Sequence, residues 1–305
     1  MPDLLVALML SLAVAVGWMG VIRLTRGVRH TSLTAAAVWA IWFQVTLTVT
    51  TVATLAKGRV PLGILDQLWY LTAVSALCPF VAVLGARRGR LLEWSLFIVL
   101  PLIVVLEWPA LAQWRPCWNG QRLELESPAV IAYAFLLLMS GAVVCGLDRA
   151  TLALSFWICT WLAVVSTRWT LLNFNQGDDD VILALAPCGL IVFWILAMIA
   201  MRRPTPHHGW ERVWYDFQKL FGSLWAMRVA LRLNELAVRE KWPWQFMLHV
   251  VQPLSGEAEH PPLPTDDPRV DHAFRWLLKP FVDPEWIDER LNAGSPPSDT
   301  SHGHE

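Results

Sequence analysis

The sequence is poor in charged residues, which make up 16% of its 305 residues, whereas hydrophobic residues make up 55%. This apolar share is well above that of ordinary soluble domains. The formal net charge is -1, so no excess of positive charge indicates a nucleic acid as a partner. The composition predicts a membrane protein whose first partner is the lipid bilayer.

Motifs of common enzymes and cofactor sites are also missing. The chain has no Gly-x-Ser-x-Gly elbow, no His-Glu-x-x-His helix and no P-loop. None of its eight histidines lies in a long apolar stretch, which argues against haem or copper bound between helices. The five cysteines show no Cys-x-x-Cys spacing, and only Cys117 lies in a polar loop. The sequence therefore indicates no catalytic residue, no metal site and no cofactor, and it does not favour an enzyme.

Long apolar stretches are what the sequence does have. Seven of them approach the length of about 20 residues that crosses a bilayer, near 3–22, 33–56, 64–86, 91–113, 129–147, 150–172 and 181–201. Arginines gather after the first, third, fifth and seventh stretches, and the positive-inside rule makes those ends cytoplasmic. We predict an all-α integral membrane protein with seven transmembrane helices, an outside N-terminus and a cytoplasmic C-terminus. The short loops and the lack of an organelle signal favour the cytoplasmic (inner) membrane of a bacterium.

Three charged residues lie near the predicted outer ends of the spans. From the cytoplasmic arginines, helix rise places Glu107 about 25 Å, Arg168 about 28 Å and Asp66 about 30 Å along their spans. Because an unpaired charge at that depth is costly, we expect Arg168 to pair with Asp66 or Glu107. This candidate charged site is either an outer gate that anchors a substrate or a structural clasp.

Hydroxyl groups and prolines interrupt the apolar stretches. Thr46, Thr50 and Thr54 share one face of the second span, where they either pack against a neighbouring helix or line a polar path. Pro79, Pro101 and Pro187 lie inside the third, fourth and seventh spans, where proline kinks or loosens a helical turn.

The chain after the last span divides by composition. Residues 1–203 form the predicted transmembrane domain, 204–250 a membrane-proximal amphipathic segment, and 251–305 an acidic proline-rich linker with short helices and a disordered tail. Residues 204–255 carry six basic and four acidic side chains, whereas 256–305 carry four basic and eleven acidic ones. Within the last segment, VDHAFRWLLKPF and DPEWIDERL predict two short helices, the second capped by Asp283.

The amphipathic segment predicts a helix from Gly209 to about Lys241. The polar residues of its first half and those of its second half do not lie on one continuous face of a straight helix. We therefore expect a bend at Gly222-Ser223, because Gly and Ser are weak points in a helix. The helix should end before Trp242-Pro243, and WQFMLHVV favours a short strand. We expect this helix to dock on protein, with membrane contact near Trp210 and Trp214. The candidate docking residues are Trp210, Trp214, Phe217, Phe221, Trp225, Arg228 and Arg232.

These observations favour a non-catalytic multi-pass membrane protein. In this interpretation it is a subunit or scaffold of a membrane complex and binds a protein partner at the cytoplasmic face through its C-terminal helices. The alternative is a small-solute or ion transporter that uses Asp66, Glu107 and Arg168. A membrane-embedded enzyme that acts on lipid with scattered carboxylates has the least support.

Overall fold

The chain forms two compact units in the computed structural model. The structure describes residues 2–56, 58–87, 91–125, 128–145, 151–166, 176–202, 209–242, 244–247, 251–253 and 267–292. Unit 1 comprises Met1–Val28 and Leu33–Arg203, and unit 2 comprises Arg29–Ser32 and Pro204–Glu305. Four of the six residues between the first two long helices therefore belong to the same unit as the C-terminal third of the chain.

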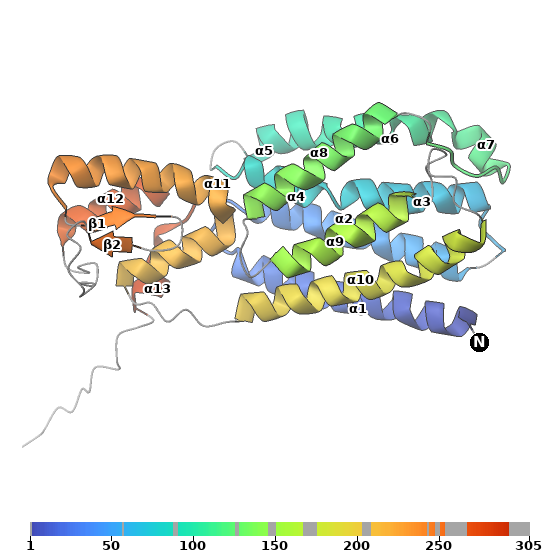
Figure 1. The fold of residues 1–305 in the computed structure, drawn as a ribbon, viewed down its shortest axis with the longest axis horizontal. Helices are drawn as coiled ribbons and strands as arrows, with labels where there is room; N and C mark the ends of the chain where they lie inside the picture. The colour runs from blue at the N-terminus through green and yellow to red at the C-terminus, as the bar shows by residue number, and fades with distance from the viewer. Residues whose placement is uncertain are drawn as a thin grey trace, which may run out of the picture. The chain divides into compact units, whose positions relative to one another are not determined.

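Unit 1 is a bundle of apolar helices (Figure 1). Its helices are α1 (Pro2–Gly27), α2 (Thr34–Leu55), α3 (Leu62–Ser75), α4 (Cys78–Leu84), α5 (Leu91–Trp94), the π-helical turn η1 (Ser95–Val99), α6 (Leu100–Ala112), α7 (Trp114–Trp118), α8 (Pro128–Cys145), α9 (Thr151–Ser166) and α10 (Gln176–Arg202). Helix α2 packs against α1, α3 and α4, and α10 packs against α1 and α9.

Four helical segments of unit 1 are long and apolar enough to cross a membrane: Leu4–Gly27, Thr34–Leu55, Leu62–Leu84 and Leu92–Ala112. The described parts of the other three predicted spans contain shorter apolar helices, Ala132–Gly141, Ala153–Val164 and Leu185–Ala200. The all-α fold is thus confirmed, and the four long apolar helices are compatible with a membrane protein. The count of seven spans and their orientation remain predictions.

Prolines explain the irregular turns of the third and fourth spans. The third consists of α3 and α4, and Pro79 follows the break between them as the second residue of α4. The fourth begins with α5 and the π-turn η1, and Pro101 follows in the first turn of α6. Proline lacks the amide hydrogen that a continuous helix needs and clashes with the carbonyl four residues before it. A break or a wider turn just before each proline removes that conflict.

Unit 2 is mostly helical. Its elements are α11 (Gly209–Glu240), β1 (Trp244–Phe246), β2 (Val251–Pro253), α12 (Pro268–Leu278) and α13 (Pro284–Asn292). The two strands pair antiparallel, with Gln245 opposite Gln252. Gly222 in α11 has φ 76° and ψ 178°, a conformation open almost only to glycine, so the predicted bend is confirmed. The predicted end of this helix before Trp242 and the two short C-terminal helices are confirmed as well.

Aromatic side chains form the core of unit 2. Phe281, in the turn after α12, contacts the rings of Phe217, Phe221 and Trp225 of α11 at centroid distances of 5.1–5.4 Å. At the start of α11, the ring of Trp210 stacks on Phe274 of α12 at 4.8 Å. Rings of this size bury a large apolar area each, so the core holds α11 against α12 and the following turn.

Candidate functional site

Asp66 of α3 is the least exposed residue among the ion pairs that the structure describes in unit 1. Its side chain is only 2% exposed, and its Oδ2 lies 3.1 Å from Nε of Arg122. Arg122 donates a second hydrogen bond to Oδ1 at 3.4 Å, and the amide of Leu123 donates to Oδ2 at 3.3 Å. Three donors therefore hold the carboxylate, and all three come from the chain after α7.

The backbone approaches α3 closely enough for this pairing because residue 63 is glycine. A Cβ at Gly63 would meet the backbone of Cys117 and of Gln121. Gly63 and Asp66 are three residues apart and so lie on the same face of α3. The glycine thus lets the segment after α7 lie against the helix, and this segment carries Arg122.

Arg168, the partner that we expected for Asp66 or Glu107, lies outside the described residues. Arg122 is a residue that sequence reasoning left in a polar loop without a role. Its signal was one of two arginines, Arg115 and Arg122, in the polar loop between two apolar stretches, and this pattern does not specify a partner. The structure supports the clasp interpretation for Asp66, because the carboxylate is already bound by side chain and backbone.

Glu107 lies on α6, a helix that packs against α3. Tyr70 donates its hydroxyl to the carbonyl of Leu106 at 2.7 Å, and Gln67 donates to the carbonyl of Ala110 at 2.8 Å. These two bonds align Glu107 with Tyr70, one helical turn beyond Asp66. The Glu107 side chain is 7% exposed, and its Oε1 has no hydrogen-bond partner among the described residues. A buried acceptor without a donor is costly, so Glu107 is an unusual residue in this bundle.

The threonine face of α2 is used for packing. Thr46 donates to the carbonyl of Phe43, and Thr54 donates to that of Thr50, both at 2.8 Å. The hydroxyl of Thr50 lies 2.8 Å from that of Thr72 on α3. These hydroxyls are therefore satisfied within the helix pair, which favours the packing alternative over a polar path.

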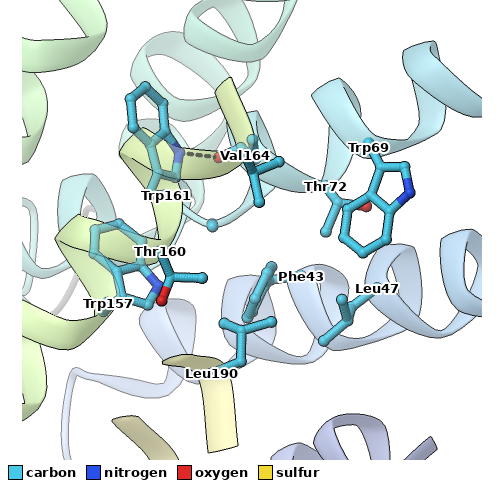
Figure 2. A pocket seen from close by; sticks show the side chains of 11 residues that line it. Phe43, Leu47, Trp69, Thr72, Trp157, Thr160, Trp161, Val164 and Leu190 are labelled. Atoms are coloured by element: carbon cyan, nitrogen blue, oxygen red, sulfur yellow. Dashed lines mark hydrogen bonds between the residues drawn. The ribbon is translucent and has the colours of Figure 1, made fainter. Parts of the chain in front are cut away.

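A small cavity lies among α2, α3, α9 and α10 (Figure 2). Its volume is about 30 Å³. Among its lining side chains, Trp161 donates its ring nitrogen to the carbonyl of Ala73 at 2.7 Å, and Thr160 bonds to Phe156 of its own helix. Small-molecule sites usually measure about 300–1,000 Å³, whereas this cavity has room for only about one or two waters. It is a packing defect rather than a substrate chamber.

Cys117 is not a reactive thiol. It is fully buried in α7, and burial raises the pKa of its thiol, with the Asp66 carboxylate acting in the same direction. The thiolate is the nucleophile, so a raised pKa makes this cysteine inert.

In unit 2, the predicted docking residues divide into two groups. The five aromatic ones are buried in the core of the unit itself: Trp210, Trp214, Phe217, Phe221 and Trp225. The rings of Trp210 and Trp214 pack inside the unit and are not exposed to a membrane or a partner, whereas membrane contact of the helix near them remains a prediction. Arg228 and Arg232 are exposed, and the guanidinium of Arg228 lies over the Trp225 ring at 4.9 Å. Of the predicted set, only the two arginines are accessible to a partner.

A groove of about 590 Å³ runs between the end of α11 and α12. It is lined by Leu236, Arg239, Glu240, Trp242, Pro268, Arg269, His272, Ala273 and Trp276. Trp276 is 63% exposed, whereas Trp242 is buried and its ring nitrogen has no hydrogen-bond partner among the described residues. Sequence reasoning missed this groove, because the two tryptophans are far apart in the chain and their proximity is tertiary.

The charges in the groove are largely balanced. Arg239 lies 3.1 Å from Glu240, and Arg269 lies 3.2 Å from Asp267 at the start of α12. The groove is thus an aromatic surface with paired charges at its edges. Its volume and its exposed tryptophan suit a partner side chain or helix better than a small anion.

Comparison with known proteins gives no guide to the function. No family model, no curated protein and no solved structure matches the chain.

Proposed function

We propose that the protein is a non-catalytic, multi-pass protein of the bacterial cytoplasmic membrane and a subunit or scaffold of a membrane complex. In this proposal seven helices cross the membrane with the N-terminus outside, and unit 2 binds a protein partner in the cytoplasm. The observation that carries it is the groove of unit 2, which has a volume of about 590 Å³ and an exposed tryptophan, Trp276.

The orientation is supported by the composition of unit 2. Arg29–Ser32 follow the first span, and they share this unit with residues that follow the last span. The positive-inside rule assigns both segments to the cytoplasm on independent grounds, the arginines after each span. Two segments of one compact unit lie on the same side of a membrane, so their shared unit supports an even number of crossings between them, as in the proposed arrangement.

The occupant of the groove in this proposal is an amphipathic helix of a partner protein. Trp276 provides an exposed aromatic side chain on which such a helix can place an apolar anchor, and tryptophan is enriched at residues that dominate binding energy. The pairs Arg239–Glu240 and Arg269–Asp267 at the edge of the groove provide polar contacts of both signs. A strongly acidic partner is disfavoured because both arginines are already paired.

The test is purification of the full-length protein from native membranes with and without Trp276→Ala. We expect one or a few proteins to accompany the wild type in fixed ratio and to be lost from this variant. Trp108→Ala is the matched control, because Trp108 is equally exposed, at 67%, but lies on α6 of unit 1. A photo-reactive residue at 272 should crosslink to the same partner. A protein that purifies alone, or a partner that is retained after Trp276→Ala, would overturn the proposal.

Ion transport is a second candidate, and Glu107 is the observation that favours it. A carboxyl group buried in a membrane bundle with an unpaired oxygen is a typical proton or cation site. The test is proton uptake into proteoliposomes under an imposed potassium gradient. Transport predicts uptake that Glu107→Gln abolishes and that Glu93→Gln, at an exposed position of α5, leaves intact. Equal uptake by both variants, or none by the wild type, would contradict it.

A further inference from the structure

Unit 2 contains a group of three metal-binding side chains that no step above uses. His30 comes from the loop between α1 and α2, and Asp283 and Glu285 flank the first residue of α13. One donor atom from each of the three lies within 4.8 Å of the other two. Nδ1 of His30 is 3.7 Å from Oδ2 of Asp283.

Backbone contacts fix the two segments against each other before any ion binds. The amide of Ser32 donates to the carbonyl of Phe281 at 2.7 Å, and the amide of Asp283 donates to the carbonyl of His30 at 2.8 Å. Thr31 and Val282 form an antiparallel bridge between these two bonds, and both are buried. The three donor side chains thus stand on a rigid backbone rather than on loose ends, which lowers the entropic cost of binding an ion.

The donor set and its spacing decide which ion fits. Zinc binds imidazole nitrogen and carboxylate oxygen at about 2.0–2.2 Å in a tetrahedron, which separates neighbouring ligand atoms by about 3.3 Å. The His30–Asp283 donor distance of 3.7 Å is close to that value, and the three donor atoms all lie within 4.8 Å of one another. Calcium needs six to eight oxygen ligands, and magnesium also prefers oxygen, so an imidazole with two carboxylates favours zinc. Partial exposure of His30 and Asp283 gives the ion an entry path and leaves a fourth position for water.

We propose that His30, Asp283 and Glu285 bind one zinc ion. The ion joins the loop between α1 and α2 to the start of α13, and it thereby stabilises unit 2, to which all three ligands belong. The two carboxylates balance the charge of the ion, and the imidazole is the ligand that selects zinc over the alkaline-earth ions. This site is independent of the groove between α11 and α12, and its failure would leave the proposed function intact.

The test uses the full-length protein in detergent, purified through a tag without histidine, stripped with a chelator and dialysed against micromolar zinc chloride. We expect about one bound zinc per chain by elemental analysis and a rise in the unfolding temperature on zinc addition. His30→Ala should abolish both. Glu285→Gln keeps the size of an exposed side chain, and it should weaken binding at least about tenfold, since loss of even an outer-shell partner costs about 10- to 100-fold.

Other histidines of the chain are the main competitors for zinc. The control variant replaces His207, His208, His302 and His304 by alanine, and it should retain one zinc and the stabilisation. No zinc bound by the wild type, or zinc that survives both His30→Ala and Glu285→Gln, would overturn the site. Equal binding of calcium, unaffected by His30→Ala, would also overturn it, because the imidazole would then have no role.

Discussion

Asp66 and Arg122 form an ion pair in which Nε lies 3.1 Å from Oδ2, and the two residues join α3 to the chain after α7. The carboxylate is buried, whereas the arginine is partly exposed, so the pair ties a polar connection to the interior of the bundle. Glu107, whose Oε1 has no hydrogen-bond partner among the described residues, lies on α6, which packs against the same helix α3.

Replacement of Arg122 by alanine should destabilise unit 1. The buried carboxylate of Asp66 would lose both hydrogen bonds from the guanidinium, and a buried polar group that loses its donors costs about 1–3 kcal/mol. Thermal unfolding of the purified protein in detergent measures the effect. Arg115→Ala is the control, because Arg115 is exposed on α7 and its only described partner is the Trp114 ring at 5.7 Å. Equal stability of the two variants would show that the pair contributes nothing.

Gly222→Ala should destabilise unit 2 by about 1–3 kcal/mol, because φ 76° with ψ 178° is strained for any residue with a Cβ. The bend redirects α11 so that both of its halves bury their apolar faces. Gly27→Ala is the matched control, since a Cβ at Gly27 meets nothing within 4 Å, and we expect its effect to stay within about 0.5 kcal/mol. Chemical denaturation that gives the same free energy of unfolding for both variants would contradict the expected strain.

The bend at Gly222 shows what the sequence can specify about this protein. Two polar rows out of phase on one helix cannot both face solvent unless the helix bends, and a Gly-Ser pair marks the place. The C-terminal end of α11 follows from Pro243, and the start of α13 follows from Pro284. In both cases proline restricts the local backbone conformation regardless of tertiary contacts. Features with a local cause were therefore predictable.

Contacts between distant segments were not predictable. The apolar face of α11 indicates that Trp210 and Phe217 are buried, but periodicity does not say whether they face a partner, a membrane or the unit itself. The bridge between Thr31 and Val282 uses backbone groups, which leave no sequence signal. Arg122 carries the same charge as Arg168, and only the fold shows that Arg122 reaches Asp66.

Arg290→Lys should destabilise unit 2 although it keeps the charge. Arg290 binds Asp216 of α11 at 2.9 Å, donates to the carbonyl of Trp286 at 3.0 Å and lies 3.8 Å over the Trp286 ring. Burial lowers the pKa of Arg290, and Asp216 opposes that shift. A lysine ammonium lacks the planar fork that makes these contacts together, so we expect a loss of about 1–3 kcal/mol.

Arg232→Lys is the control for this exchange. Arg232 pairs with Glu235 at 2.7 Å, but both side chains are more than half exposed, and solvent-exposed pairs contribute about 0–1 kcal/mol. Its free energy of unfolding should therefore match that of the wild type. If Arg290→Lys were as stable as Arg232→Lys, the buried arrangement would depend on charge alone.

Asp267 should make the stability of unit 2 sensitive to acid. It is the N-cap of α12, and the amide of Arg269, followed by its guanidinium, lowers the pKa of this carboxyl from its ordinary value of 3.8. Because the folded pKa lies below the unfolded one, the ionised cap stabilises the unit fully above pH 3.8, and this contribution is lost as the pH falls through the lowered pKa. Asp267→Ala should therefore unfold at a lower temperature than the wild type at pH 7, and the difference should shrink below pH 3.8. Asp267→Asn retains a capping side chain without a titrating group, so its difference from Asp267→Ala should stay constant with pH. A gap between wild type and Asp267→Ala that persists unchanged in acid would mean that the carboxylate charge does not contribute.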